Sequence, residues 1–281
     1  MWSRNGRIAA PIAGASSDIV ARTTRAGDGN FESASMTSAG ERRLLVWRDV
    51  ISRLDELLPQ GGGSEPVGRV VITAPELFGR HVVLPLIDTF LERYPRVTAR
   101  LLLLNRTVNL IGEGIDLAVR LAPLQDSTLT AVRVGEVRTQ LCASPAYCDR
   151  AGVPATPDDL QHHDCIGLDA TADDELWSFI EPSGGRRRSI RIRPRLSING
   201  AAAAIDEAIR GRGVIQARSY QVATAITDGQ LMPLLSEWQG PPIPVHLVFP
   251  PARGARRPLR TLIDELAPQL RRALSGELTA S

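Results

Sequence analysis

Three short segments place hydroxyl or amide side chains directly before a predicted helix, where they could bind an anion. They are Thr73-Ala74-Pro75, Ser144 before Pro145, and Asn199-Gly200. The first turn of a helix leaves backbone N–H groups without intrahelical acceptors, and these groups favour a carboxylate or a phosphate. Gly200 would also let a ligand approach the backbone. The alternative for Thr73, Ser144 and Asn199 is that each only caps its helix, which requires no ligand.

Two further polar positions follow predicted strands in the first half of the chain. Arg120 ends one strand, and its guanidinium could bind a carboxylate with two parallel hydrogen bonds. An ion pair with Asp116 or Glu113, or exposure to solvent, is an equal alternative. Asn105 and Arg106 follow another strand and are weaker candidates of the same kind. The sequence therefore favours a small-anion site at the strand ends.

The chain lacks the residue patterns of common catalytic and metal sites. It has no G-x-S-x-G, no Walker loop and no H-E-x-x-H. Adjacent residues of an extended chain point to opposite faces, so His162 and His163 cannot easily bind one ion. Cys142, Cys148 and Cys165 have no zinc spacing and are odd in number, which favours reduced structural thiols. We expect no catalysis, no metal and no cofactor.

The elements that must position the candidate residues alternate between strands and helices. Strands are expected at 69–73, 97–103 and 115–119, with helices at 76–93 and 107–113 between them. This order predicts an α/β fold with a parallel sheet and right-handed crossovers. Beyond it we expect strands at 138–143, 196–199, 214–216 and 245–249, helices at 201–210 and 257–274, and a hairpin of 177–180 with 189–193 whose solvated tip carries Arg186-Arg187-Arg188.

The N-terminal part of the chain divides into two segments. Residues 1–36 have little periodic apolar pattern and are expected to be loose. A helix is expected over 37–59, from a capping box at Ser38 and Glu41 to Pro59, before a triglycine linker. Its apolar residues are spaced as in a two-heptad coiled coil: Leu44, Trp47, Ile51, Leu54 and Leu58. We expect this helix to pair two chains, with packing on its own domain as the alternative.

The composition is that of a soluble globular protein, with 43% hydrophobic residues and no apolar run near the roughly 20 residues of a membrane helix. The N-terminus lacks the apolar stretch of a secretory signal, so we expect a cytoplasmic protein. The 33 basic residues are all arginine and face 31 acidic ones. A net charge of +2 gives little support to attraction of the whole protein to DNA.

Several motifs, taken in their order, resemble the effector-binding domain of LysR-type transcriptional regulators. The most specific are the E-G-x-D-L-A-x-R block at 113–120 and the A-S-P-A-Y block at 143–147, joined by Thr73-Ala74-Pro75, Tyr94-Pro95 and Gly211-Arg212-Gly213. The resemblance implies a two-lobed type 2 periplasmic-binding-protein fold over 68–274. Lobe I would comprise about 68–140 and 244–274, and lobe II about 141–243.

The same resemblance implies a function. The chain would bind a small organic or aromatic acid between its lobes and act on promoter DNA as a homodimer or homotetramer. Arg22 and Arg25 resemble a remnant of the family's DNA-binding wing, and 37–59 its linker helix. Only 21 residues precede Arg22, so we expect weak DNA binding by this chain alone. The alternative is a stand-alone solute-binding protein of the same fold, which would require a secretion signal.

Overall fold

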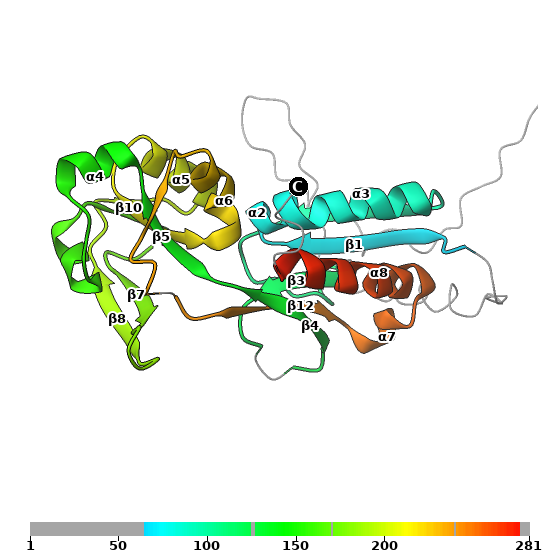
Figure 1. Ribbon diagram of the computed structural model, residues 1–281. Coiled ribbons are helices and arrows are strands. Elements are labelled where there is room, and N and C mark those ends of the chain that lie inside the picture. The colour runs from blue at the N-terminus through cyan, green and yellow to red at the C-terminus, as the bar shows by residue number, and fades with distance from the viewer. Residues whose placement is uncertain (1–64, 125–126, 170, 239, 276–281) are drawn as a thin grey trace, which may run out of the picture. The chain divides into compact units, whose positions relative to one another are not determined.

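The computed structural model describes residues 65–124, 127–169, 171–238 and 240–275 (Figure 1). These residues belong to one compact unit, Glu65–Ser281. The helix expected at 37–59, with its five apolar residues, lies outside the described residues, as do Arg22 and Arg25. Pairing through that helix and the domain boundaries therefore stay predictions.

The first of two five-stranded sheets has the order β2-β1-β3-β12-β4. Its strands are β1 (Gly68–Ala74), β2 (Val97–Leu103), β3 (Leu117–Leu121), β4 (Thr130–Val137) and β12 (Ile243–Phe249). The first three are parallel, as predicted, whereas β12 runs antiparallel to β3 and β4. The helical run between β1 and β2 comprises α2 (Glu76–Phe78), a π-helical turn (Gly79–Val83) and α3 (Leu84–Arg93). With α7 (Pro251–Gly254) and α8 (Arg257–Leu274), these elements are called lobe I.

The second sheet has the order β11-β5-β10-β6-β9. Its strands are β5 (Thr139–Ala143), β6 (Cys165–Gly167), β9 (Leu196–Ser197), β10 (Val214–Arg218) and β11 (Met232–Leu234). Here β6, β9 and β10 are parallel, and β5 runs antiparallel to β10. Its helices are α4 (Pro145–Ala151), the 3-10 helix Pro157–His162, α5 (Ala201–Ile209) and α6 (Ser219–Thr227), and a hairpin joins β7 (Glu175–Ile180) to β8 (Arg187–Ile192). These elements are called lobe II.

The buried side chains explain why each lobe holds together. In β1, Val70, Ile72 and Ala74 alternate into a core that also receives Phe78 and, from α8, Leu262. The β7–β8 hairpin buries one face by the same alternation and places the aromatic side chains of Trp177 and Phe179 under lobe II. Burial of apolar surface is thus arranged by the period of two in the strands.

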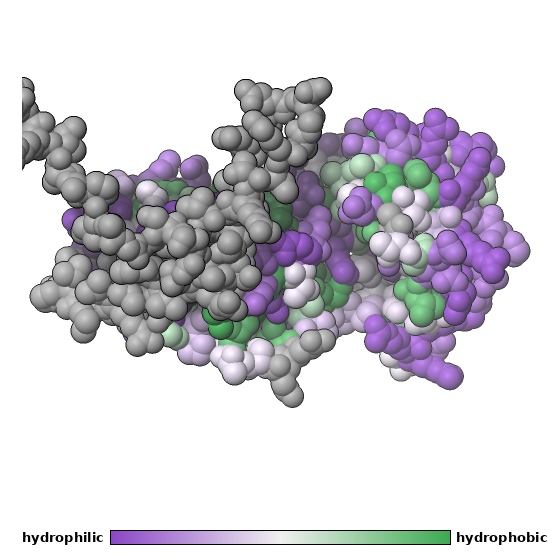
Figure 2. Space-filling view, turned by 180° about the vertical axis from the view of Figure 1, so that it is seen from behind, coloured by the Kyte–Doolittle hydropathy of each residue, from purple (hydrophilic) through white to green (hydrophobic). Residues whose placement is uncertain are grey.

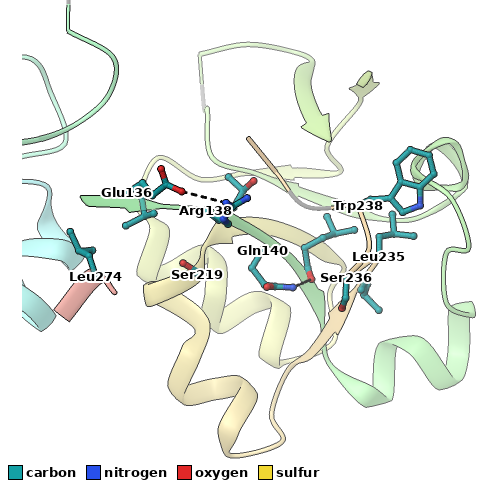
Figure 3. Close-up of a pocket in the computed structure, with 12 residues that line it drawn as sticks. Glu136, Arg138, Gln140, Ser219, Leu235, Ser236, Trp238 and Leu274 are labelled. Carbon is teal, nitrogen blue, oxygen red and sulfur yellow. Dashed lines mark hydrogen bonds and ion pairs between the residues drawn. The ribbon is translucent and has the colours of Figure 1, made fainter. Parts of the chain in front are cut away.

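The chain crosses between the sheets twice, at Arg138 and between Leu234 and Ile243. A Cβ at Gly240 would clash with Oγ1 of Thr139, so the second crossing lies against the first and requires glycine there. A cavity of about 380 Å³ adjoins both crossings, and Glu136, which pairs with Arg138 at 3.3 Å, lines it (Figure 3).

Two sequence predictions in lobe I were wrong. The helix expected at 107–113 is replaced by turns at 110–114. The Oδ1 of Asn109 accepts the N–H of Gly112 at 3.1 Å and starts a single turn, which ends at Gly114 with φ at +69°. The third strand begins at Leu117 rather than 115, because the side chain of Asp116 takes the N–H of Val71. Strand β4 and helix α6 had no sequence prediction.

Candidate functional site

A pocket of about 370 Å³ lies at the carboxyl ends of β1, β2 and β3 in lobe I. Five of the eight residues predicted to bind an effector line it, namely Thr73, Ala74, Pro75, Asn105 and Arg120. These residues come from three segments distant in sequence, and the parallel order of the strands brings their ends to one edge. The structure therefore unites most of the predicted residues in one cavity.

Thr73 is buried at 5% exposure and does not cap the helix that follows it. Its hydroxyl donates to the carbonyl of Leu102 on the neighbouring strand at 2.9 Å. The residue at the helix start is Pro75, which makes no side-chain cap. The hydroxyl of Thr73 is therefore not required as a cap, and its oxygen keeps its acceptor lone pairs beside the pocket.

Asn105 provides the contact at this helix start. Its Oδ1 accepts the N–H of Glu76 at 3.0 Å, and its Nδ2 donates to Glu76 Oε2 at 3.4 Å. A side chain after β2 thus satisfies an orphan N–H at the start of the run after β1. The local sequence around Glu76 does not indicate this cap, because Asn105 lies 29 residues away.

Arg120 is half-buried at the end of β3 and donates from Nη2 to the carbonyl of Val108 at 3.3 Å. Neither acidic partner considered from the sequence pairs with it. Glu113 instead receives two hydrogen bonds from Arg106, at 3.0 and 2.8 Å, and Arg106 lowers the pKa of the Glu113 carboxyl. The carboxylate of Asp116 pairs with Arg253 and Arg256. No carboxylate of the described residues forms an ion pair with Arg120.

Asp116 fixes the strands that carry this site. It is 4% exposed, and its carboxylate accepts hydrogen bonds from Val71 N (2.8 Å), Arg253 Nη1 (2.9 Å) and Arg256 Nη1 (3.3 Å). A buried charge is tolerated when it is paired and hydrogen-bonded in this way. Asp116 therefore ties β1, the start of β3 and the α7 region together beneath the pocket.

His246 is a neighbour of the site that sequence reasoning missed. It lies on β12 opposite Arg120 of β3 and Arg133 of β4. Burial lowers the pKa of its imidazole, against a backbone hydrogen bond with Ala122 that raises it. Within the described part of the chain, its Nδ1 is buried without a hydrogen-bond partner. Nothing in the sequence around His246 indicates that it lies opposite Arg120, because the pairing of β12 with β3 has no local pattern.

Ser144 does not join the pocket. Its Oγ accepts the N–H of Tyr147 at 3.3 Å, so the residue caps α4 and is buried at 2% exposure. Because β5 runs antiparallel to β10, Ser144 lies at the end of the lobe II sheet away from the crossover, beside Gly211. Ser144 was predicted to bind the effector, and the structure instead places it outside the lobe I pocket as the cap of α4, which was its alternative.

Asn199 and Gly200 lie at the opposite end of the lobe II sheet from Ser144. They follow β9, which is parallel to β6 and through it to β10. The carboxyl end of β10, Arg218, pairs with Thr139 at the crossover, so the carboxyl end of β9 faces the same way. Gly200 begins α5 without any side-chain cap, and a Cβ there would meet open space. Asn199 is exposed.

The histidines and cysteines of lobe II have structural contacts. The hydroxyl of Tyr147 accepts the N–H of Asp164 at 2.9 Å and lies 3.1 Å from His163 Nδ1. All three thiols are free and buried, and burial raises the pKa of Cys142 and Cys165 to about 12. Across the described ranges, no three His, Cys, Asp or Glu side chains are grouped to hold a metal ion. Nor does any helix in those ranges have the length and apolar character needed to cross a membrane.

Comparison with known proteins gives a consistent result. A family model described as "LysR substrate binding domain" matches residues 63–271. A "Probable HTH-type transcriptional regulator LtrA" of Klebsiella pneumoniae is 28% identical over 223 residues, which are 79% of this chain and 69% of that protein. The "HTH-type transcriptional regulator PtxR" of Pseudomonas aeruginosa is 30% identical over 258 residues, or 90% of this chain and 79% of that protein.

A solved structure agrees with the sequence matches. The regulatory domain of CrgA, a LysR-type transcriptional regulator from Neisseria meningitidis, superposes with a TM-score of 0.65 at 26% identity. The match covers 73% of this chain and 100% of that one. Across the first five curated relatives, this chain spans between 61% and 79% of the relative's own length.

Proposed function

We propose, from the premise that the chain belongs to the LysR substrate-binding-domain family, that it senses a small organic acid for a transcriptional regulator. The observation that carries this proposal is the lobe I pocket, in which Thr73 and Arg120 line one cavity. Its volume of about 370 Å³ falls within the range of small-molecule sites. We extend to this chain the transcriptional role that the relatives' names state.

The charge of the pocket supports an acid as the ligand. Arg106 also lines the cavity, but Glu113 neutralises it through two hydrogen bonds. Arg120 has no such carboxylate among the described residues. A guanidinium has five N–H donors, and Arg120 gives one of its groups to Val108, so donors remain for a carboxylate. We therefore assign the main charge contact of the ligand to Arg120.

Thr73 and its neighbours supply the polar edge of the same site. A carboxylate needs a donor, so the Thr73 proton would turn from the Leu102 carbonyl toward the ligand. Ala74 and Pro75 form the adjoining backbone wall, and Asn105 holds the helix start in place. From lobe II, Asn199 and the open position at Gly200 would approach the ligand from the carboxyl end of β9.

The helix next to this corner offers a route from the ligand to lobe II. Phe78 of α2 contacts Tyr220 of α6 edge to face, with ring centroids 5.1 Å apart. Leu77 is buried in a cluster with Ile205 and Val222 of lobe II. A ligand that contacts both Thr73 and Asn199 would favour the lobe arrangement that permits both contacts, to the extent that it binds that arrangement more tightly.

A thermal-shift screen of small organic acids on the purified chain tests the function, because a ligand that binds the folded state raises the melting temperature. Calorimetry with a positive acid then compares Arg120→Gln and Thr73→Val with the unmodified chain. We expect Arg120→Gln to weaken binding about tenfold to a hundredfold and Thr73→Val about tenfold, the scale of lost charge-assisted hydrogen bonds.

Ser144→Ala is the matched control, since it removes a hydroxyl at a helix start outside the pocket. It should leave the affinity for the acid unchanged. A screen with no positive acid, or an acid whose affinity is the same in Arg120→Gln and the unmodified chain, would contradict the proposed ligand class. If Thr73→Val binds as tightly while its melting temperature falls, the Thr73 hydroxyl supports only the sheet.

The oligomer and the DNA contact extend the same function. We propose that two chains pair through the helix predicted at 37–59, in a homodimer or a homotetramer, and that the chain regulates transcription at promoter DNA, to which it binds only weakly by itself. The double change Ile51→Glu and Leu54→Glu places charges in the apolar seam and should weaken self-association. Sedimentation at micromolar concentration measures this. An unchanged oligomer would assign the main interface to the lobes.

A further inference from the structure

A second pocket, of about 360 Å³, lies in lobe II at the end of the sheet away from the crossover. It adjoins the amino ends of β6 and β10, because Val214 pairs with Cys165 there. The lobe I pocket lies instead at the carboxyl ends of its strands. The second cavity is therefore a separate site and not an extension of the first.

Four arginines line this second pocket, Arg150, Arg195, Arg210 and Arg212. Only two carboxylates, those of Asp164 and Glu207, line it with them, which leaves an excess of two positive charges. The whole chain carries a net charge of +2. An excess as large as that of the entire protein is thus concentrated in one small cavity.

The carboxylates occupy only part of the arginine donors. Arg195 pairs with Asp164 at 3.2 Å, while Glu207 is shared by Arg210 and, at 3.9 Å, by Arg212. The side chains of Arg195, Arg210 and Arg212 are between 63% and 77% exposed, so most of their N–H donors face solvent. A planar guanidinium presents paired N–H groups that match carboxylate and phosphate oxygens.

The fold holds Arg150 against the turn at Gly211 that carries two of the other arginines. Arg150, near the end of α4, donates to the carbonyl of Gly211 at 2.8 Å and lies over the ring of Tyr147 at 5.4 Å. Gly211, with φ at +78°, turns the chain so that Arg210 and Arg212 flank it. The carbonyls that end α5 accept backbone N–H groups, including Arg212 N to Glu207 O at 3.1 Å, which orders the turn that carries Arg212.

Cys165 and Leu196 form the less polar part of the lining. Cys165 is 1% exposed, and burial raises the pKa of its thiol to about 12. It therefore remains a neutral thiol at physiological pH beneath the pocket wall and is not a nucleophile. Leu196 is 40% exposed and offers an apolar surface for a carbon skeleton.

We infer that this arginine pocket of lobe II binds a small polyanion, a molecule with two or more neighbouring phosphate or carboxylate groups. The excess positive charge and the several arginine donors favour clustered anionic oxygens, and the volume suits a small molecule. The occupant is distinct from the small organic acid proposed for the lobe I pocket, where a single arginine provides the charge.

The test uses two probes, inorganic pyrophosphate and citrate, titrated into the full chain at constant ionic strength in a calorimeter. We expect saturable one-site binding of at least one probe. The double variant Arg210→Gln, Arg212→Gln should weaken it about tenfold to a hundredfold, because two charge-assisted contacts are lost. Binding of pyrophosphate alone would indicate a phosphorylated ligand, and of citrate alone a polycarboxylate.

A matched control separates a built site from general surface charge. The surface of lobe II is largely hydrophilic on the face seen in Figure 2, and its hairpin carries further arginines. The pair Arg186→Gln, Arg187→Gln removes the same charge from exposed positions at that hairpin. It should leave probe affinity within about twofold.

Three outcomes would overturn the inference. The first is that neither probe shows saturable binding. The second is that the Arg186, Arg187 variant weakens probe binding as much as the Arg210, Arg212 variant does. The third is that Arg120→Gln abolishes probe binding while the Arg210, Arg212 variant leaves it unchanged. The last outcome would assign the anion to the lobe I pocket. Circular dichroism and the ligand-free melting temperature of each variant confirm that a weakened affinity does not come from unfolding.

Discussion

The corners at Thr73 and Ser144 carry the same chemical pattern and do different things. Each is a hydroxyl residue at the end of a strand, with a proline close behind it at the start of a helix. Ser144 caps α4, because its Oγ accepts the N–H of Tyr147 at 3.3 Å, and it is buried within lobe II. Thr73 caps nothing, donates to the strand beside it at 2.9 Å, and lines a pocket.

Strand direction explains the difference. Strand β1 is parallel to both of its neighbours, so its carboxyl end joins theirs at one edge, where helix starts and strand ends leave a cavity. Strand β5 is antiparallel to β10, so its carboxyl end lies among amino ends. A hydroxyl before a proline thus predicts a strand-to-helix corner, but the direction of the neighbouring strands decides whether that corner can meet a ligand.

The largest effect expected concerns what holds the Thr73 corner. Asp116→Ala removes the carboxylate that bonds Val71, Arg253 and Arg256 and leaves two partly buried arginines without it. Breaking a buried pair of this kind costs about 3–5 kcal/mol of unfolding free energy. Urea denaturation measures it. Asp264→Ala, in an exposed pair 3.9 Å from Arg260, is the control and should change stability by less than about 0.5 kcal/mol.

If Asp116→Ala and Asp264→Ala lower the free energy of unfolding by the same small amount, Asp116 does not hold the strand ends in place. The geometry of the Thr73 corner would then have to come from apolar packing alone. The corners at Thr73 and Ser144 would then not differ in what holds them in place, because apolar packing would do so at both.

A smaller effect is expected at the other corner. Ser144→Ala removes a helix cap and should lower the free energy of unfolding by about 1 kcal/mol, with no change in the affinity for an organic acid. Thermal unfolding and calorimetry on the same preparation measure both. A loss of acid affinity without a loss of stability would show that Ser144 reaches the ligand after all.

The smallest effect concerns pH and the His246 neighbour of the lobe I pocket. Burial lowers the pKa of its imidazole in the folded state, so the unfolded chain binds this proton more readily. Its contribution to stability is present above the unfolded pKa, about 6.5, and is lost as the pH falls through the folded value. The melting temperature should therefore fall between pH 7.5 and 5.5 by more in the unmodified chain than in His246→Gln.

His81→Gln, at an exposed position, is the matched histidine-to-glutamine control and is measured over the same pH range. An identical loss of melting temperature in His246→Gln and the unmodified chain would assign the acid sensitivity to other groups.

The sequence predicted local features well and relations between distant segments poorly. The apolar periods placed β1, β2, α5 and α8 close to their observed bounds, and the motif order indicated the family. The antiparallel course of β5 and β12 had no local signal, so the sequence could not show that Ser144 lies outside the pocket that Thr73 lines. Asn105 as the cap for Glu76 and Asp116 as the partner of Arg253 depend on contacts between residues 29 and 137 positions apart.

The contact of Gly240 with Thr139 has a consequence for how this fold can be built. Lobe II leaves the lobe I chain after Val137 and returns to it at Ile243, and the two junctions touch. It is therefore an insertion with adjacent ends, which costs its host little loop-closure entropy. We expect lobe II to be exchangeable as a cassette, so that a relative's lobe grafted at these two junctions would give a chimaera that keeps the lobe I pocket.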